Sequence, residues 1–320
     1  MTGNQSDMAQ SPPAAESTDG LASARLGVFG GSGLYAMEGL ETLREVDLDT
    51  PFGRPSDTFR IGRIGGLDVV FLARHGRYHS FSPTEVPYRA NLWAMRSLGV
   101  RWILSVSAVG SLQEHIRPLD MVVPDQFVDR TRQRPLSFFD RGLVAHVAVA
   151  DPYCAALSRI LEDVADRRMP QGRQLHRGGT YLCMEGPAFS TRAESQLYRS
   201  WGCSVIGMTN HTEARLAREA EMAYTTLAMV TDYDCWHPSH DSVSVELVVG
   251  NLRANATLAQ EIVRDAAERI AAVRPASEAH GALRYALMTP PEQVPAETRK
   301  RTELFTAPYW DQSKSGSGPA

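Results

Sequence analysis

The residues of this chain that could do chemistry follow short apolar runs, and they are of few kinds. The first run leads into the glycine-rich loop 30–33, which includes one serine. Arg74 and His75 follow a second run, and the hydroxyl residues Ser107 and Thr209 end or follow two others. Glycine amides let an anion approach the backbone closely, and a guanidinium binds anion oxygens in pairs. These residue types suit an oxyanion such as phosphate.

Two carboxylates follow the last of these runs. Asp232 and Asp234 bracket Tyr233, so an extended backbone would point both carboxylates the same way, whereas a turn would change this. A buried aspartate with a raised pKa can protonate a departing heterocycle. The second carboxylate can accept a hydrogen bond from an amino group on that heterocycle. The pattern therefore predicts a site for an anion beside a hydrogen-bonding ring.

Each of these motifs also has an ordinary explanation. Gly31, Gly33 and Ala36 fit the dinucleotide pattern G-x-G-x-x-A, so this loop alone leaves a dinucleotide site, a phosphate site and a plain turn open. Arg74 and His75 could equally be a salt-bridged arginine beside a core histidine. The two aspartates could equally belong to a solvated acidic loop. A dinucleotide site needs no arginine and hydroxyls at other strand ends, so the combination favours phosphate.

Composition limits the classes of protein that the chain can belong to. It has 320 residues, of which 43% are hydrophobic and 22% charged, as in an ordinary globular protein. The formal net charge of -4 gives no electrostatic support for nucleic acid or an anionic membrane as a partner. We find neither an apolar stretch of about 18 residues nor a secretion signal, so we expect a cytoplasmic protein. The dispersed cysteines and histidines predict no metal site.

The elements that must position these residues alternate between short β-branched runs and longer segments of helical period. This alternation is typical of a mostly parallel sheet covered by helices, in which ligands bind at the carboxyl ends of the strands. The predicted strands are 26–29, 67–73, 102–107, 121–124, 203–208 and 225–231. The predicted helices are 87–98, 152–167, 190–200, 212–222, with Thr212 as its N-cap, and 244–273.

The organisation of the chain follows from its composition. Residues 1–23 are rich in small and polar residues, so we expect a disordered tail there. We assign residues 24–279 to the main domain and 280–308 to an extension that packs on the domain or on a neighbouring chain. Residues 309–320 end in QSKSGSGPA, which is typical of a flexible tail.

Several long motifs resemble one family. The runs CMEGPAFSTRAESQLYRSWGCSVIGMT and AREAEMAYTTLAMVTDYDCWH resemble the methylthioadenosine branch of the purine nucleoside phosphorylases, and GGSGLY, ARHGR, PYRANLWAMRSLGV and SAVGSL follow the family's order. The resemblance covers roughly residues 25–275. It implies an α/β fold of the nucleoside phosphorylase/hydrolase type, a single domain with a twisted mixed β-sheet flanked by helices.

The resemblance also implies a set of phosphate-binding residues. Family members often have threonine where Ser32 and Ser107 stand, but either hydroxyl can bind phosphate. The implied phosphate site consists of Ser32, Arg74, His75, Ser107, Ala108 and Thr209.

For the nucleoside, the resemblance places Phe189 against the base and the Met208 backbone at the ribose hydroxyls. Asp232 matches the residue that faces purine N7, and Asp234 matches the reader of the 6-amino group. Relatives that act on 6-oxopurines have asparagine in this region, so the DYD sequence favours adenine.

Two further features are implied by the resemblance. Val245, Val248 and Val249 would surround the 5′ substituent, although valines at this spacing are equally typical of a helix core. His146 resembles a residue that family trimers donate to the neighbouring subunit's site, which implies a homotrimer.

The implied reaction is phosphorolysis of 5′-methylthioadenosine to adenine and 5-methylthioribose 1-phosphate, a step of purine and methionine salvage. Inorganic phosphate is the co-substrate, and we expect no metal or other cofactor. The alternatives are a phosphorylase of 6-oxopurine nucleosides, a hydrolase of the same fold that releases free pentose, and a nucleotide-binding module without catalysis.

Overall fold

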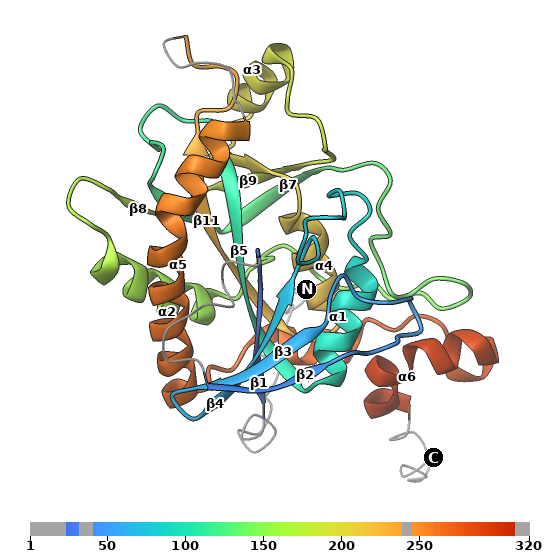
Figure 1. Ribbon diagram of the computed structural model, residues 1–320. Coiled ribbons are helices and arrows are strands. Elements are labelled where there is room, and N and C mark those ends of the chain that lie inside the picture. The colour runs from blue at the N-terminus through green and yellow to red at the C-terminus, as the bar shows by residue number, and fades with distance from the viewer. Residues whose placement is uncertain (1–23, 32–40, 239–244, 311–320) are drawn as a thin grey trace, which may run out of the picture.

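The computed structural model describes residues 24–31, 41–238 and 245–310, with only the backbone of 41–43 and 245–248. The strands within these residues form one mixed sheet (Figure 1). They are β1 Arg25–Gly30, β2 Glu41–Val46, β3 Phe59–Ile64, β4 Leu67–Ala73, β5 Val100–Ser111, β6 Met121–Val123, β7 Gln126–Arg130, β8 Leu175–Arg177, β9 Thr180–Met184, β10 Val205–Gly207 and β11 Ala223–Asp232.

The helices lie around this sheet. They are α1 Tyr88–Ser97, α2 Ala155–Arg168, α3 Arg192–Ser200, α4 Asn210–Glu219, α5 Val245–Val273 and α6 Ala296–Trp310, with the 3₁₀ turns η3 Glu278–Gly281 and η4 Pro291–Gln293.

The centre of the sheet is parallel. β1 pairs in parallel with β4 on one side and with β5 on the other, and β5 also pairs in parallel with β11. The distal part of β5 pairs antiparallel with β10, so this long strand joins the two halves of the sheet. The carboxyl ends of β4, β1, β5 and β11 therefore face the same way, which is the arrangement that gathers ligand-binding residues at one edge.

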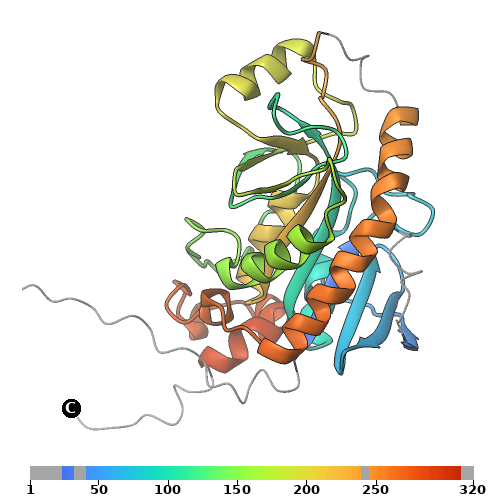
Figure 2. The ribbon, with the colours of Figure 1, turned by 90° about the vertical axis from the view of Figure 1, so that its left-hand side faces the viewer.

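Helices cover both faces of the central strands. Val69 and Phe71 of β4 pack in the core under α2 and α5, while Val70 and Leu72 pack in the core under α1 and α4. Figure 2 shows α5 running along one face of the sheet. Because both faces are covered, the strand LDVVFLA is apolar almost throughout rather than alternating. Each fully buried side chain of this size contributes about 1.5–3 kcal/mol to folding.

Most of the predicted elements agree with the structure, and one prediction about them is wrong. The six predicted strands and five predicted helices coincide with β1, β4, β5, β6, β10, β11 and α1 to α5 within a few residues. Thr212 is not an N-cap: α4 begins at Asn210 with Thr209 as the capping residue, and Thr212 is buried in the first turn. Thr209 and Thr212 are both of a residue type that caps helices, so residue type alone does not decide between them, and the Thr209 side chain makes no capping hydrogen bond.

The segment after η3 packs on its own chain. Phe305 of α6 is buried against Phe138, with ring centroids 4.6 Å apart. Thr298 donates a hydrogen bond to the carbonyl of Arg141 at 2.8 Å, and the Tyr309 hydroxyl bonds to the Glu221 carboxylate. α6 thus closes the end of the core that α1 covers (Figure 1).

Candidate active site

Arg74 lies immediately after β4 and is buried. Its amide donates to the carbonyl of Gly30 at 3.1 Å, which holds the end of β4 against the end of β1. Its guanidinium forms a two-oxygen ion pair with Glu213 of α4. It also donates to Ser105 Oγ at 2.7 Å and to the carbonyl of Val106 at 3.1 Å. Burial lowers the pKa of Arg74, but the charge and hydrogen bonds of Glu213 raise it more, so the guanidinium stays charged.

His75 is half-buried beside this guanidinium. Its Nδ1 lies 2.9 Å from the carbonyl oxygen of Phe81, and its ring stacks on that of His79. A carbonyl only accepts, so Nδ1 carries the proton and donates. Burial and the positive charge of Arg74 lower the pKa of His75 to about 4, so the ring is neutral at pH 7. Its Nε2 is therefore an acceptor, suited to a protonated anion oxygen.

Ser107 carries a hydroxyl on the same face of β5 as Ser105. Its Oγ is buried beside the buried hydroxyl of Tyr181, and the one hydrogen bond that these two hydroxyls can share leaves one of their two protons without an acceptor within the described residues. Leaving such a group unpaired costs about 1–3 kcal/mol. An oxygen or donor group of a ligand would recover this cost. Ala108, the next residue, pairs with Met229 of β11.

Thr209 connects β10 to α4 and is buried. Its carbonyl accepts from the amide of Glu213 at 3.4 Å, so Thr209 lies one turn before the residue that binds Arg74. The free amides and the dipole of a helix N-terminus favour an anion at this point. The Thr209 side chain is not used for capping, so its hydroxyl is available to such an anion.

The two aspartates lie at the end of β11. The ladder between β11 and β5 is irregular between Val230 and Asp232, and it sets Asp232 opposite Gly110. Asp232 accepts hydrogen bonds from the amide of Asp234 and from Thr231 Oγ1, both at 2.7 Å. Asp234 has a positive φ of 52°, so the backbone turns here and the two carboxylates are not aligned as on an extended strand.

Burial perturbs both acids. It raises the pKa of Asp232, the hydrogen bonds from Thr231 and the Asp234 amide offset part of the rise, and the charge of Asp234 adds to it. Burial likewise raises the pKa of Asp234, and the nearby Ser195 hydroxyl offsets part of that rise. Asp232 therefore has the property expected of a general acid.

Gly110 is a site residue that sequence reasoning missed. A Cβ at this position would lie 2.9 Å from Asp232 Oδ1, 3.2 Å from Ile206 Cγ2 and 3.3 Å from Asp234 Cβ. Only glycine lets the two acids approach β5 this closely. The SAVGSL motif contained the residue, but nothing in the sequence indicated which side chain it accommodates.

Arg134 is a second missed residue, and it organises the other side of the site. Its side chain is buried and donates to the carbonyl of Met208 at 2.5 Å and to the carbonyl of Glu185 at 2.7 Å. It also pairs with the Glu185 carboxylate at 3.1 Å. Arg134 therefore ties the strand end that carries Met208 to the loop that leads to Phe189, whose side chain is 46% exposed.

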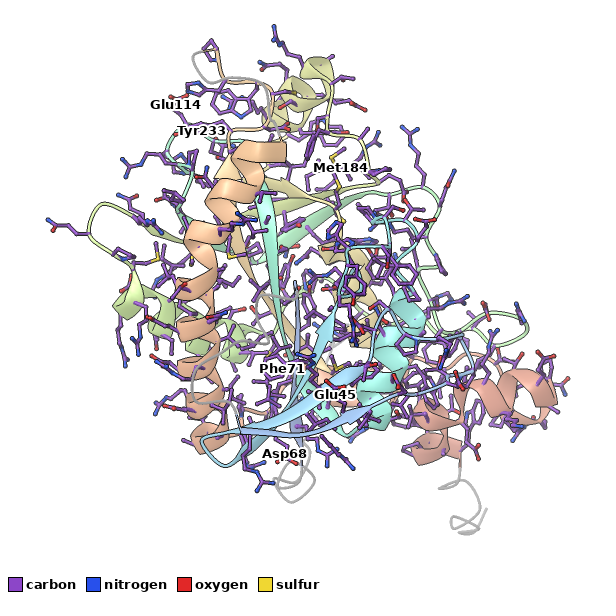
Figure 3. All side chains as sticks on the ribbon, in the orientation of Figure 1. Glu45, Asp68, Phe71, Glu114, Met184 and Tyr233 are labelled. Carbon is purple, nitrogen blue, oxygen red and sulfur yellow. The ribbon has the colours of Figure 1, made fainter. Side chains whose placement is uncertain are left out.

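The predicted phosphate and acid residues are connected through β5, β10 and the start of α4. The Cβ position of Gly110 touches both Asp232 and Ile206 of β10. Three residues later the chain reaches Thr209, whose carbonyl holds Glu213, and Glu213 holds Arg74. Figure 3 shows Tyr233, next to the acids, in the upper half of the view and Asp68, at the start of β4, at its lower edge.

Other predicted residues lie outside this group. Ser32 is outside the described residues, and Val245 and Val248 belong to the part of α5 described by backbone alone. Val249 is exposed at the same end of α5. His146 lines a separate cavity of about 250 Å³ together with residues 145–149, Arg215 and Glu219.

The described residues contain neither a membrane-spanning helix nor a metal-binding cluster. No described helix is both long enough and apolar enough to cross a membrane. Within the same residues, histidine, cysteine and acidic side chains nowhere gather in threes around a point that could hold a metal ion.

Known proteins resemble the whole of this architecture. Residues 25–268 match the profile of the phosphorylase superfamily. S-methyl-5′-thioadenosine phosphorylase of Prochlorococcus marinus is 66% identical over 290 residues, which cover 91% of this chain and 92% of that protein. The corresponding protein of Thermosynechococcus vestitus is 60% identical over 287 residues, covering 89% of this chain and 99% of that one.

Solved structures of methylthioadenosine phosphorylases are also similar to this chain. A methylthioadenosine phosphorylase from an antarctic soil metagenomic library superimposes with a TM-score of 0.85 at 51% identity, covering 89% of this chain and 99% of the other. The methylthioadenosine phosphorylase of Schistosoma mansoni in complex with adenine superimposes with a TM-score of 0.74 at 36% identity, covering 78% and 92%.

Proposed function

The chain belongs to the phosphorylase superfamily, within it to the S-methyl-5′-thioadenosine phosphorylases, and from this premise we propose that it cleaves S-methyl-5′-thioadenosine with inorganic phosphate. The products are adenine and 5-methylthioribose 1-phosphate. The observation that carries the proposal is that a buried acid with a raised pKa, Asp232, and the anion-binding groups of Arg74 and Ser107 all rest on β5.

In the proposed reaction a phosphate oxygen forms a bond to the anomeric carbon as the bond from that carbon to N9 breaks. The bonding electrons pass into the purine, and Asp232 supplies the proton that N7 takes up. The phosphate is held by Arg74, His75, Ser32, Ser107, Ala108 and Thr209. Positioning and electrostatics then account for most of the rate, and no side chain acts as a nucleophile.

The preference for adenine rests on Asp234. A carboxylate accepts a hydrogen bond from the 6-amino group, whereas a 6-oxo group would face it with another acceptor. A buried acceptor left without a donor is disfavoured strongly, so a 6-oxopurine is rejected at this position. Phe189 packs on the base, and the Met208 backbone, held by Arg134, binds the ribose.

The 5′ side of the site and the assembly form a further part of the proposal. Val245, Val248 and Val249 provide an apolar slot for the methylthio group. His146 lines a cavity with Arg215 and Glu219, and neither Asp232 nor Asp234 is among the residues that line it. A residue donated to a neighbouring subunit's site need not line the site of its own chain, and we propose a homotrimer in which His146 completes the site of the next chain.

The proposed chemistry needs no metal or organic cofactor, because phosphate is the nucleophile and Asp232 supplies the proton. Nothing in the net charge of -4 favours nucleic acid or membrane as a partner. We also propose that the enzyme is cytoplasmic.

The test is adenine release from methylthioadenosine with and without phosphate. We expect release only with phosphate, formation of 5-methylthioribose 1-phosphate, and no effect of a chelator. Release of free methylthioribose without phosphate would identify a hydrolase instead. Faster turnover of inosine than of methylthioadenosine would identify a 6-oxopurine phosphorylase, and no release from either would leave a binding module.

A further inference from the structure

The Glu213 carboxylate collects four hydrogen-bond donors in the buried space under α4. Arg74 Nε donates to Oε1, and Arg74 Nη2 donates to Oε2 at 3.1 Å. Ser105 Oγ donates to Oε2 at 2.8 Å, and the Tyr224 hydroxyl donates to the same oxygen at 2.9 Å. All four residues are buried. A carboxylate that accepts four hydrogen bonds fixes the orientation of the side chains that donate them.

The directions of the hydrogen bonds from Ser105 and Tyr224 to Glu213 follow from their other partners. Ser105 Oγ accepts from Arg74 at 2.7 Å, so its own proton is free for Glu213. The Tyr224 hydroxyl accepts from Asn210 Nδ2 at 3.4 Å and gives its proton to Glu213. Burial and the charge of Glu213 raise the pKa of Tyr224, so its hydroxyl keeps that proton. Both oxygens of the Glu213 carboxylate are satisfied, which makes this anchor rigid.

We propose that Glu213 is a positioning residue for phosphate binding: it fixes the guanidinium of Arg74 so that one Nη1 hydrogen is left for the anion. The inference rests on the proposed function of Arg74. Four of the five guanidinium hydrogens go to Glu213, Ser105 and the carbonyl of Val106. The fifth has no partner within the described residues.

The position requires a carboxylate rather than an amide. A glutamine oriented with its oxygen toward Ser105 and Tyr224 would turn its amide hydrogens toward Arg74 Nε. The opposite orientation would turn the amide hydrogens toward the three donors that Oε2 accepts from, which are Arg74 Nη2, Ser105 and Tyr224. In either case donors face each other, and Arg74 loses its fixed direction. Before phosphate binds, the Glu213 carboxylate also neutralises the buried charge of Arg74, because an unpaired buried charge is strongly unfavourable.

The test uses three variants. Glu213→Gln breaks the anchor, and Tyr224→Phe keeps the ring but removes one of the four donors. Glu221→Gln is the matched control, because Glu221 is also a buried glutamate with two hydrogen bonds but lies after α4 and away from Arg74. For each, initial rates are measured with phosphate and methylthioadenosine varied in turn. Binding of inorganic phosphate is measured by calorimetry, and thermal unfolding is followed.

We expect Glu213→Gln to raise the KM and the Kd for phosphate by about tenfold or more, the loss expected for one misdirected charge-assisted hydrogen bond. The KM for methylthioadenosine should change by less than about threefold. Tyr224→Phe should shift phosphate binding in the same direction by about two- to fivefold, and Glu221→Gln should change only the unfolding temperature.

Unchanged phosphate binding in Glu213→Gln would overturn the proposal, and so would a loss of phosphate and nucleoside binding in equal measure. If Glu213→Gln does not fold, Tyr224→Phe decides: wild-type phosphate affinity in that variant refutes the inference. A wild-type enzyme that binds phosphate but releases no adenine would refute the proposed function while leaving this inference open to the calorimetric test.

Discussion

Gly110→Ala is expected to damage catalysis by displacing the general acid. The added Cβ would lie 2.9 Å from Asp232 Oδ1, about 0.5 Å closer than an ordinary contact. The Cβ cannot move away, because Ile206 Cγ2 lies at 3.2 Å and Asp234 Cβ at 3.3 Å. Asp232 is itself fixed by two hydrogen bonds of 2.7 Å, so the overlap must break one of them or shift the carboxylate.

The magnitude follows from how far the acid moves. A misplacement of about 1 Å in a catalytic group can lower the rate by roughly a hundredfold, so a shift of about half that should lower kcat by about ten- to a hundredfold. Crowding in a packed site costs about 1–3 kcal/mol of folding free energy. Arg74, Ser105 and Thr209 are untouched, so the KM for phosphate should stay within about twofold of wild type.

The assay is steady-state adenine release with phosphate and nucleoside varied in turn. Gly281→Ala is the matched control, because a Cβ there meets nothing within 4 Å and the residue has no positive φ. The control should behave as wild type. A Gly110→Ala enzyme with wild-type kcat would refute the assignment of Asp232 as a tightly positioned acid.

Three further predictions follow from the same site and its surroundings. Asp232→Asn should lower kcat by about 10²- to 10⁴-fold while phosphate still binds, and near-normal turnover in the variant would contradict the role of Asp232 as the acid. The kcat of the wild-type enzyme should fall as the pH rises through the raised pKa of Asp232, because only the protonated carboxyl can donate a proton. Asp234→Asn should improve the rate on inosine relative to methylthioadenosine by about tenfold or more, measured as the ratio of kcat/KM values, and an unchanged ratio would show that Asp234 does not read the 6-position. Burial raises the pKa of Glu219 from 4.5 to about 7. Between these two pH values the unfolded chain loses the Glu219 proton and the folded protein keeps it, so the free energy of unfolding should fall by about 3 kcal/mol as the pH rises from 4.5 to 7. Glu219→Gln should lack this loss in urea unfolding at pH 5 and pH 8, and an equal pH dependence in both proteins would count against the shifted pKa.

The sequence was most informative where a strand ends. Strands such as LDVVFLA are apolar throughout because both faces are covered, so their boundaries are visible as changes in composition, and β4 ends at Ala73 as expected. The next residue, Arg74, then falls at the ligand-binding edge of any parallel sheet. The sequence therefore indicates Arg74 as a candidate anion-binding residue and Asp232 and Asp234 as candidate acids, and these roles stay predictions.

Sequence patterns could not reveal partners chosen across the fold. Glu213 is 139 residues from Arg74, and in the sequence it is one more acidic residue in the first turn of a helix. Arg134 lies in a segment without regular period, and its importance comes from the backbone carbonyls of Met184, Glu185 and Met208, to which it donates hydrogen bonds. The turn at Asp234 was likewise open, because a positive φ at a non-glycine residue has no reliable sequence signal.

β5 explains how these separate residues form one site. Ser105 of this strand holds Arg74, Ser107 offers a hydroxyl whose neighbour is the Tyr181 hydroxyl, and Gly110 makes room for Asp232. A strand advances about 3.3 Å per residue, so the five steps from Ser105 to Gly110 span roughly 16 Å, enough for a phosphate, a pentose and the near edge of a purine. Substitutions on β5 should therefore change the separation between anion and acid, and substitutions on the flanking elements should change only one of the two. This difference makes Gly110→Ala and Glu213→Gln complementary: the first should alter kcat and the second the KM for phosphate.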